Sequence, residues 1–279
     1  MTIAVIWQEN GRQWCAADTR LVAGSEDKPT TEIATKIYAI PVVASAMDQE
    51  DHLRIPHYWT QYGFAYAGSA LPATMTAVTA STLLQKLARP GDLSNPPTFE
   101  QIAGFVHRLA ERFMKERRQF SEGKGKNSDD GIFSAAFFGW CPHEMKYKVA
   151  HIDGRMEAAF RVELTYPDAP PKDGDPWLVL GTAKEAFDEA LKAYRRTEPH
   201  ITSGLPRRAI DKMVAEGPDP TVGGATSIGA AGQNGFDLFW VAEPITPGQP
   251  QARRLFNGLD LDTEVGQIGQ YLVASTGIA

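Results

Sequence analysis

The sequence has little that would support a metal site, a disulfide framework or a membrane span. Its 279 residues include only two cysteines and six histidines. These residues form neither a Cys-x-x-Cys nor a His-Glu-x-x-His pattern, so we expect no metal and no disulfide. No stretch approaches the about 20 apolar residues of a membrane-spanning helix, so a membrane is not an expected partner.

Concentrated positive charge is also missing. The chain has 28 basic and 34 acidic residues and a formal net charge of −6. Its densest basic run, residues 115–118, contains a glutamate and lies in a helical pattern, which is typical of a solvated face. Nucleic acid is therefore not an expected partner. The N-terminal segment lacks the basic start and apolar run of a secretory signal, so we expect a cytoplasmic protein.

The overall composition is that of an ordinary globular protein. Hydrophobic residues make up 43% of the sequence and charged residues 22%, which allows a large core. We expect one domain over residues 1–279, with a core over about 2–245 and a C-terminal extension over about 249–279. Cys15 and Cys141 lie in strand-like segments and are expected to be buried free thiols.

The N-terminal segment predicts a hairpin over residues 2–18. Apolar residues dominate residues 3–7 and 13–17, and Asn10-Gly11 between them supplies the positive φ angles of a tight turn. Chain termini usually fray. A chain that enters a strand at its second residue therefore hints that its terminus is part of a site.

The middle of the chain mixes strands and helices. Strands are predicted over residues 36–43 and 62–68, and the polar, aromatic insertion 47–60 between them is predicted as a surface loop or subunit contact. Helices are predicted over 71–87 and 98–120, the second opened by a capping box of Thr98 and Gln101. Strands follow over 132–140, 145–151 and 155–164, with a tight turn at Asp153-Gly154.

The last part repeats this order. We predict a strand over 177–181, helices over 183–194 and 206–216, and strands over 225–231 and 236–242. Alternating groups of strands and helices indicate an α+β fold. The specific expectation is a four-layer αββα sandwich, with two stacked antiparallel sheets and helices outside.

A candidate nucleophile stands at the start of the chain. A threonine hydroxyl is a poor nucleophile unless a base takes its proton, and an N-terminal threonine can use its own α-amine. The reference pKa of that amine, about 7.7 to 8.0, suits a general base near neutral pH. Thr2 is preceded only by Met1, and threonine is small enough that removal of the methionine is expected.

Two charged residues could assist Thr2. A hairpin of this length returns the end of its second strand to the first residue, so Asp18 can approach Thr2. Lys36, on the next strand, could lower the pKa of the hydroxyl and keep Asp18 ionised. The alternative is a surface ion pair without catalytic meaning.

The segment Ala-Ala-Asp-Thr-Arg at residues 16–20, followed by Ala-Gly at 23–24 and by Lys36, resembles the start of proteasome β subunits and of HslV. The greater length suggests a divergent bacterial homologue similar to Anbu or to the betaproteobacterial proteasome homologue. This resemblance implies an N-terminal nucleophile (Ntn) hydrolase in which Thr2 is the nucleophile, assisted by Asp18 and Lys36. It also implies that the backbone N–H of Gly68 stabilises the oxyanion.

Later segments of the chain also resemble the family's patterns, but with substitutions. Thr182 corresponds to the serine of a Gly-Ser-Gly pattern that assists the terminal amine. Asp219 opens a segment similar to the family's Asp-x-x-Ser-Gly-Gly, but Val222 replaces its serine, which removes one hydrogen bond near the amine. Leu21 and Tyr66 fall where the family builds its main specificity pocket, or they simply fill the core.

The resemblance therefore implies a self-compartmentalising threonine peptidase. It needs no cofactor, because side chains and the terminal amine supply the chemistry. The implied partners are further copies of the chain, a peptide or unfolded-protein substrate and, in some relatives, an ATP-dependent unfoldase. Two alternatives stay open, a small-molecule amidase on the same fold and a catalytically inactive ring-forming scaffold.

Overall fold

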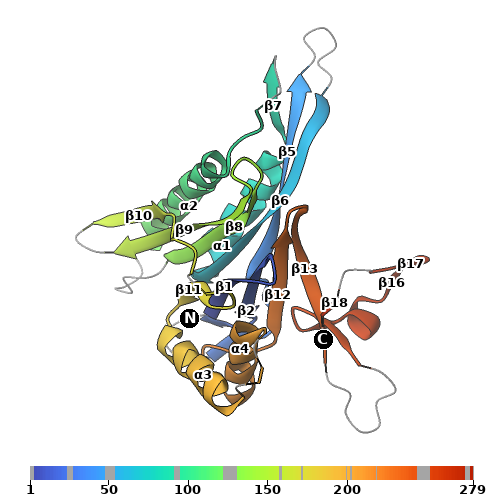
Figure 1. The fold of residues 1–279 in the computed structure, drawn as a ribbon. Coiled ribbons are helices and arrows are strands. Elements are labelled where there is room, and N and C mark those ends of the chain that lie inside the picture. The colour runs from blue at the N-terminus through green and yellow to red at the C-terminus, as the bar shows by residue number, and fades with distance from the viewer. Residues whose placement is uncertain are drawn as a thin grey trace. The chain divides into compact units, whose positions relative to one another are not determined.

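A computed structural model of the chain (Figure 1) describes residues 3–23, 28–47, 54–90, 95–121, 131–156, 159–170, 172–198, 200–201, 203–217, 219–243, 252–273 and 277–278. The chain divides into two compact units. The first unit comprises residues 1–37, 170–230 and 238–279, and the second comprises residues 38–169 and 231–237. Each unit contains a sheet and a pair of helices.

The first unit is organised around the sheet β11-β1-β2-β12-β13-β14-β15, with β18 paired to β13. Its strands are β1 (Ile3–Glu9), β2 (Arg12–Asp18), β11 (Pro176–Gly181), β12 (Thr226–Gly232), β13 (Gly235–Ala242), β14 (Arg254–Phe256), β15 (Leu259–Asp260) and β18 (Gly277–Ile278). Smaller elements are β3 (Leu21–Ala23), β4 (Lys28–Thr31), β16 (Gln267–Ile268), β17 (Tyr271–Leu272) and the π-helix η2 (Leu261–Val265). Strands β14 and β15 show that part of the C-terminal segment extends the sheet.

The predicted N-terminal hairpin is confirmed. Strands β1 and β2 pair antiparallel, with Ala4 opposite Ala17. The turn residues Asn10 and Gly11 have φ angles of 51° and 70°, which is the left-handed conformation that Asn-Gly adopts readily. This local signal fixes the register of the strand pair and places Asp18 at the end of β2.

Helices α3 (Lys184–Thr197) and α4 (Leu205–Glu216) cover one face of this sheet. Alternate residues of β1, namely Ile3, Val5 and Trp7, pack with Phe187 of α3 and Met213 of α4 in one buried apolar cluster. The alternation follows from the pleat, which directs every second side chain to the same face.

The second unit has the sheet β10-β9-β8-β6-β5-β7. Its strands are β5 (Ile37–Met47), β6 (Arg54–Gly68), β7 (Leu87–Pro90), β8 (Phe133–Cys141), β9 (Lys146–Met156) and β10 (Phe160–Thr165). Helices α1 (Ala70–Leu84) and α2 (Phe99–Ser121) pack on it around an aromatic core that includes Tyr62, Phe99 and Phe137. The Phe99 and Phe137 rings lie 5.5 Å apart.

The start of α2 matches its prediction. The backbone N–H of Thr98 donates to Gln101 Oε1 at 2.9 Å, and the backbone N–H of Gln101 donates to Thr98 Oγ1 at 3.3 Å. This reciprocal pair is the predicted capping box, which satisfies amide groups that have no partner within the helix.

The insertion predicted as a loop over residues 47–60 is corrected by the structure. Residues 54–60 are the first part of β6, whereas residues 48–53 lie outside the described ranges. The cause is the run Tyr58-Trp59-Thr60, because aromatic and β-branched side chains favour extended backbone over a loop.

The tight turn predicted at Asp153-Gly154 is also wrong. Both residues lie inside β9, where Gly154 pairs with Val162 of β10. A β-carbon on Gly154 would lie 2.6 Å from Met114 Sδ and 3.0 Å from the carbonyl oxygen of Phe133. The glycine therefore permits a close approach within the sheet, which is a second common role of glycine in strands.

The first predicted helix is shorter than expected. It was predicted to end at residue 87, but it ends at Leu84, and β7 follows.

The observed class is a mixed α+β fold with predominantly antiparallel sheets, in agreement with the expected class. Cys15 and Cys141 are buried free thiols, as predicted. Within the described ranges, the structure has no helix that is long and apolar enough to cross a membrane.

Candidate active site

The candidate site starts from Asp18 at the end of the N-terminal hairpin. Asp18 is fully buried, and its Oδ1 accepts a hydrogen bond of 3.1 Å from the backbone N–H of Ile3. The register of β1 and β2 produces this contact, because it brings the last residue of β2 beside the first residues of β1.

Lys36 lies just before β5, and its side chain is one of the largest that are fully buried in the described chain. Its Nζ donates to Asp18 Oδ1 at 2.8 Å, and both side chains have 0% exposure. One carboxylate oxygen therefore receives both the lysine ammonium and the Ile3 amide. The alternative of a surface ion pair is excluded, because this pair has no contact with solvent.

Burial shifts both charged groups towards their neutral forms. Desolvation raises the pKa of Asp18 above its ordinary value, and the Lys36 ammonium and the amides of Ile3 and Gly223 act in the opposite direction. Desolvation likewise lowers the pKa of Lys36, an effect that the charge of Asp18 opposes. Each group thus depends on the other to remain ionised.

The second carboxylate oxygen of Asp18 is also engaged. Asp18 Oδ2 accepts from the backbone N–H of Gly223 at 3.2 Å and from that of Arg20 at 3.3 Å. Four donors therefore converge on this carboxylate. A carboxylate with several N–H donors is stabilised in its ionised form, and the converging bonds fix its orientation.

Arg20 connects Asp18 to the segment 219–224. Its Nη1 donates to the carbonyl oxygens of Pro220 at 2.8 Å and Val222 at 3.2 Å. Its Nε lies 3.0 Å from a carboxylate oxygen of Glu32. The planar guanidinium presents several donors at fixed angles, so one side chain holds two chain segments beside Asp18.

The structure leaves no room for a side chain at either glycine of this segment, Gly223 or Gly224. A β-carbon on Gly223 would overlap the Arg20 guanidinium, and one on Gly224 would overlap the backbone carbonyl of Glu32. Gly224 also has a φ of +77°, where a side chain is strained. The Gly-Gly pair therefore allows the segment to approach Arg20 and Glu32 closely.

The polar residues of the same segment form local contacts. Asp219 Oδ1 accepts from the backbone N–H of Thr221 at 2.8 Å and from its hydroxyl. The Val222 side chain is fully buried in the apolar cluster of the first unit. Val222, which replaces the expected serine, therefore contributes to the packing of this cluster. The Thr221 hydroxyl already donates to Asp219.

Thr182 follows the edge strand of the same sheet. Gly181, the last residue of β11, is the register partner of Ile3. Thr182 comes directly after it and is exposed. The first unit therefore brings Asp18 and Lys36 to Ile3, and it places Thr182 next to the residue that pairs with Ile3.

Thr2 and Met1 lie outside the described residues. Covalent geometry alone constrains Thr2, because its carbonyl carbon is bonded to the Ile3 nitrogen and adjacent Cα atoms are about 3.8 Å apart. The Ile3 nitrogen is the atom that donates to Asp18. The proposed nucleophile is therefore joined by one peptide bond to the group held by the buried ion pair.

The remaining predicted residues are Gly68, Tyr66 and Leu21. Gly68 belongs to the second unit and has a φ of +107°, and a β-carbon there would lie 2.8 Å from the carbonyl oxygen of Ile132. Tyr66 is also in the second unit, where it is 1% exposed in the apolar core and stacks on Tyr38. Leu21 is half-buried in β3 of the first unit. Their roles in binding or catalysis stay predictions.

Sequence reasoning did not find every residue of this cluster. The amides of Ile3 and Gly223 and the Arg20 side chain were not assigned contacts with Asp18 or with its supporting segment. Arg20 had a signal, because it closes the Ala-Ala-Asp-Thr-Arg motif. Glu32 had none, since a single acidic residue in a loop is common.

Comparison with known proteins adds an independent observation on the fold. The structure is similar to that of a mutant of Anbu from Hyphomicrobium sp. strain MC1, with a TM-score of 0.53 and 16% sequence identity. The match covers 95% of this chain and 90% of that chain. Anbu is a bacterial proteasome-like Ntn hydrolase. No family model matches the sequence, and no curated protein matches it either.

The chain has a proteasome-like fold. The suggested likeness to Anbu is thereby confirmed at the level of structure. At 16% identity the likeness describes the fold alone. The chemistry of the chain has to be argued from its own residues.

Proposed function

We propose that this chain is a threonine peptidase of the Ntn class, with Thr2 as its nucleophile and the Thr2 α-amine as its base. The observation that carries the proposal is the fully buried Asp18–Lys36 pair, whose Oδ1 also accepts the Ile3 amide. Burying two charges is costly and seldom stabilises a fold more than apolar packing would. A charged pair kept beside the residue that follows Thr2 therefore favours a catalytic role.

The proposed chemistry needs a free threonine at the N-terminus. Thr2 Oγ attacks the carbonyl carbon of a peptide bond while the α-amine takes the hydroxyl proton and then delivers it to the leaving amine. An acyl-enzyme results, and water activated by the same amine releases it. In this scheme the positive charge of Lys36 stabilises the developing alkoxide, and Asp18 holds Lys36 in its charged form.

Further residues are proposed for supporting roles. The backbone N–H of Gly68 is proposed as the oxyanion donor, because a position without a side chain admits a substrate carbonyl closely. Thr182 and Asp219 are proposed to orient the terminal amine, and Leu21 and Tyr66 to contribute to substrate preference. The four-layer αββα arrangement is proposed together with this assignment.

The proposal includes assembly. Further copies of the chain are proposed to form a closed or helical oligomer that encloses the sites. Its substrate is proposed to be a peptide or an unfolded protein, delivered in some circumstances by an ATP-dependent unfoldase. Enclosure would protect folded proteins from a peptidase whose own preference is for modest apolar side chains.

Intact-mass spectrometry of natively expressed protein tests the first requirement. The expected mass is that of a chain beginning at Thr2, because any residue in front converts the base into an amide. Thr2→Ala should abolish hydrolysis of fluorogenic peptides, because alanine has no hydroxyl nucleophile. Its thermal unfolding midpoint is measured alongside, to show that the lost activity does not come from unfolding. A dominant species that retains Met1 yet cleaves peptides would refute the mechanism.

One observation favours a second candidate, a ring-forming scaffold without activity. Val222 occupies the place of a serine in the pattern that the sequence resembles, and its side chain is buried among apolar residues. The terminal amine would then lack one hydrogen-bonding partner. A protein that begins at Thr2, assembles, and remains inert towards peptides and acylating probes would be this scaffold.

A further inference from the structure

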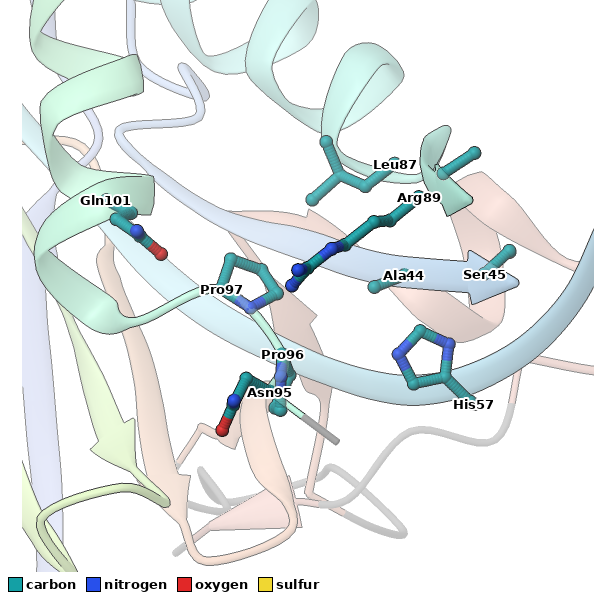
Figure 2. Close-up of a pocket in the computed structure, with 10 residues that line it drawn as sticks. Ala44, Ser45, His57, Leu87, Arg89, Asn95, Pro96, Pro97 and Gln101 are labelled. Carbon is teal, nitrogen blue, oxygen red and sulfur yellow. The ribbon is translucent and has the colours of Figure 1, made fainter. Parts of the chain in front are cut away.

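A pocket lies in the second unit, at the edge of its sheet where β7 runs parallel to β5. The pocket has a volume of about 220 Å³. It is formed by β5, β6 and β7, by the segment that leads into α2 and by Gln101 in the first turn of α2, as Figure 2 shows. None of these residues takes part in the candidate active site.

The pocket combines an apolar base with polar groups. Leu87, Ala44 and Pro97 contribute apolar surface, and Arg89 and His57 are the basic residues of its wall. The Arg89 side chain extends from β7 across the pocket towards Pro97 (Figure 2). A small pocket with an apolar wall and a few convergent polar groups is the usual form of a small-molecule site.

Charge indicates which ligand would fit. All ten lining residues are described, and none of them is acidic. Arg89 carries a permanent positive charge, and its planar fork matches the two oxygens of a carboxylate. Neutral histidine also offers one N–H donor, so His57 can add a second contact. Both residues are exposed at the pocket, so their charges and donors are accessible to a ligand that enters from solvent.

Size narrows the ligand further. A volume of about 220 Å³ lies below the usual range for drug-sized ligands, which begins at about 300 Å³. The site therefore suits a small organic anion with a short apolar body rather than a nucleotide or a long chain. Leu87 and Pro97 offer the surface against which that body would lie.

We propose that the Arg89 pocket binds a small organic carboxylate, with the guanidinium on the carboxylate and the apolar body against Leu87 and Pro97. This site is independent of the proposed peptidase chemistry. One of its lining residues, His57, belongs to residues 47–60, which the sequence marked as an insertion.

Titration of the full-length protein with sodium butyrate at constant ionic strength tests the proposal, followed by saturation-transfer NMR of the ligand. Saturable binding is expected. Arg89→Gln should weaken the affinity about tenfold or more, because a hydrogen bond to a charged group contributes about 1.5 kcal/mol or more, and about 1.4 kcal/mol corresponds to a tenfold change in affinity. The matched control is Arg112→Gln, which removes the same charge from an exposed position on α2. It should change the affinity less than twofold.

A shorter ligand and a second variant test the specificity of the pocket. Acetate should bind at least threefold more weakly than butyrate, because it lacks most of the apolar body. His57→Gln provides a second variant should Arg89→Gln fail to fold, and it should weaken butyrate at least threefold. Equal binding by wild type and Arg89→Gln, equal loss in Arg112→Gln, or a site that takes inorganic phosphate but no butyrate would each overturn the proposal.

Discussion

Among single residues, Asp18 and Lys36 determine what the site can do. Their ion pair has no solvent exposure, and the carboxylate is oriented by the amides of Ile3 and Gly223. The contact between Asp18 and Gly223 joins residues 205 positions apart in the sequence. The pair is therefore a product of tertiary structure and depends on the segment that Arg20 holds in place.

Lys36→Met tests this role. It should reduce covalent labelling of Thr2 by at least a hundredfold, and it should lower the free energy of unfolding by about 3–5 kcal/mol, because it leaves a buried carboxylate without its cation. Chemical denaturation and labelling rates measure the two effects. Lys115→Met is a suitable control, since Lys115 pairs with Glu111 at 51% exposure, and exposed pairs contribute less than about 1 kcal/mol.

The double variant Asp18→Asn with Lys36→Met separates stability from chemistry. It removes both charges and keeps a side-chain oxygen for the Ile3 amide, so part of the lost stability should return while labelling stays absent. Labelling near the wild-type rate in either variant would assign the pair a purely structural role.

The return of Asp18 to the start of the chain was predictable because the hairpin is local, and the pairing of Asp18 with Lys36 was predictable from the motif that the sequence resembles. Their complete burial and the Gly223 contact were not, because they depend on segments about 200 residues apart. Val222 illustrates the same limit. The sequence identified the replacement, but only the structure shows that the side chain packs in the apolar cluster.

At the scale of secondary structure, short sequence patterns predicted the structure correctly where each pattern is compatible with a single local conformation. The Asn10-Gly11 turn and the Thr98–Gln101 capping box both formed as predicted. Gly154 shows the opposite case, because an Asp-Gly pair can mark a turn or a close approach inside a strand. The sequence alone cannot separate these, since Met114 and Phe133 approach Gly154 only after folding.

Gly154→Ala tests whether the close approach requires glycine. The added methyl group would meet Met114 Sδ and the backbone of Phe133, so the variant should lose about 1–3 kcal/mol of stability through overpacking. Gly232→Ala is the control, because a β-carbon at Gly232 meets nothing within 4 Å. Thermal or chemical unfolding measures both. Equal stability of the two variants would show that the strand has room for a side chain at residue 154.

At the scale of the whole chain, each compact unit contains one buried thiol. Cys15 is on β2 of the first unit and Cys141 on β8 of the second, and both are at most 1% exposed. Burial raises the pKa of the Cys15 thiol, which further suppresses the reactive thiolate.

Both cysteines should therefore resist a thiol reagent in the native protein and react together with global unfolding. Reaction with a chromogenic disulfide at increasing denaturant, with each site identified by peptide mass, measures this. Rapid labelling of either cysteine without denaturant would show that its unit is packed less tightly than the structure indicates.

The similarity to Anbu supports the fold across 95% of the chain, but it leaves the central claim, the catalytic use of Thr2, to experiment. A peptide epoxyketone is the most direct probe, because closing its six-membered ring requires both a hydroxyl nucleophile and a free α-amine on one residue. We predict an adduct on the peptide that begins with Thr2, bonded through Oγ and the amine, and none in Thr2→Ala. The contradicting result is the absence of any adduct on an assembled protein whose mass shows that it begins at Thr2.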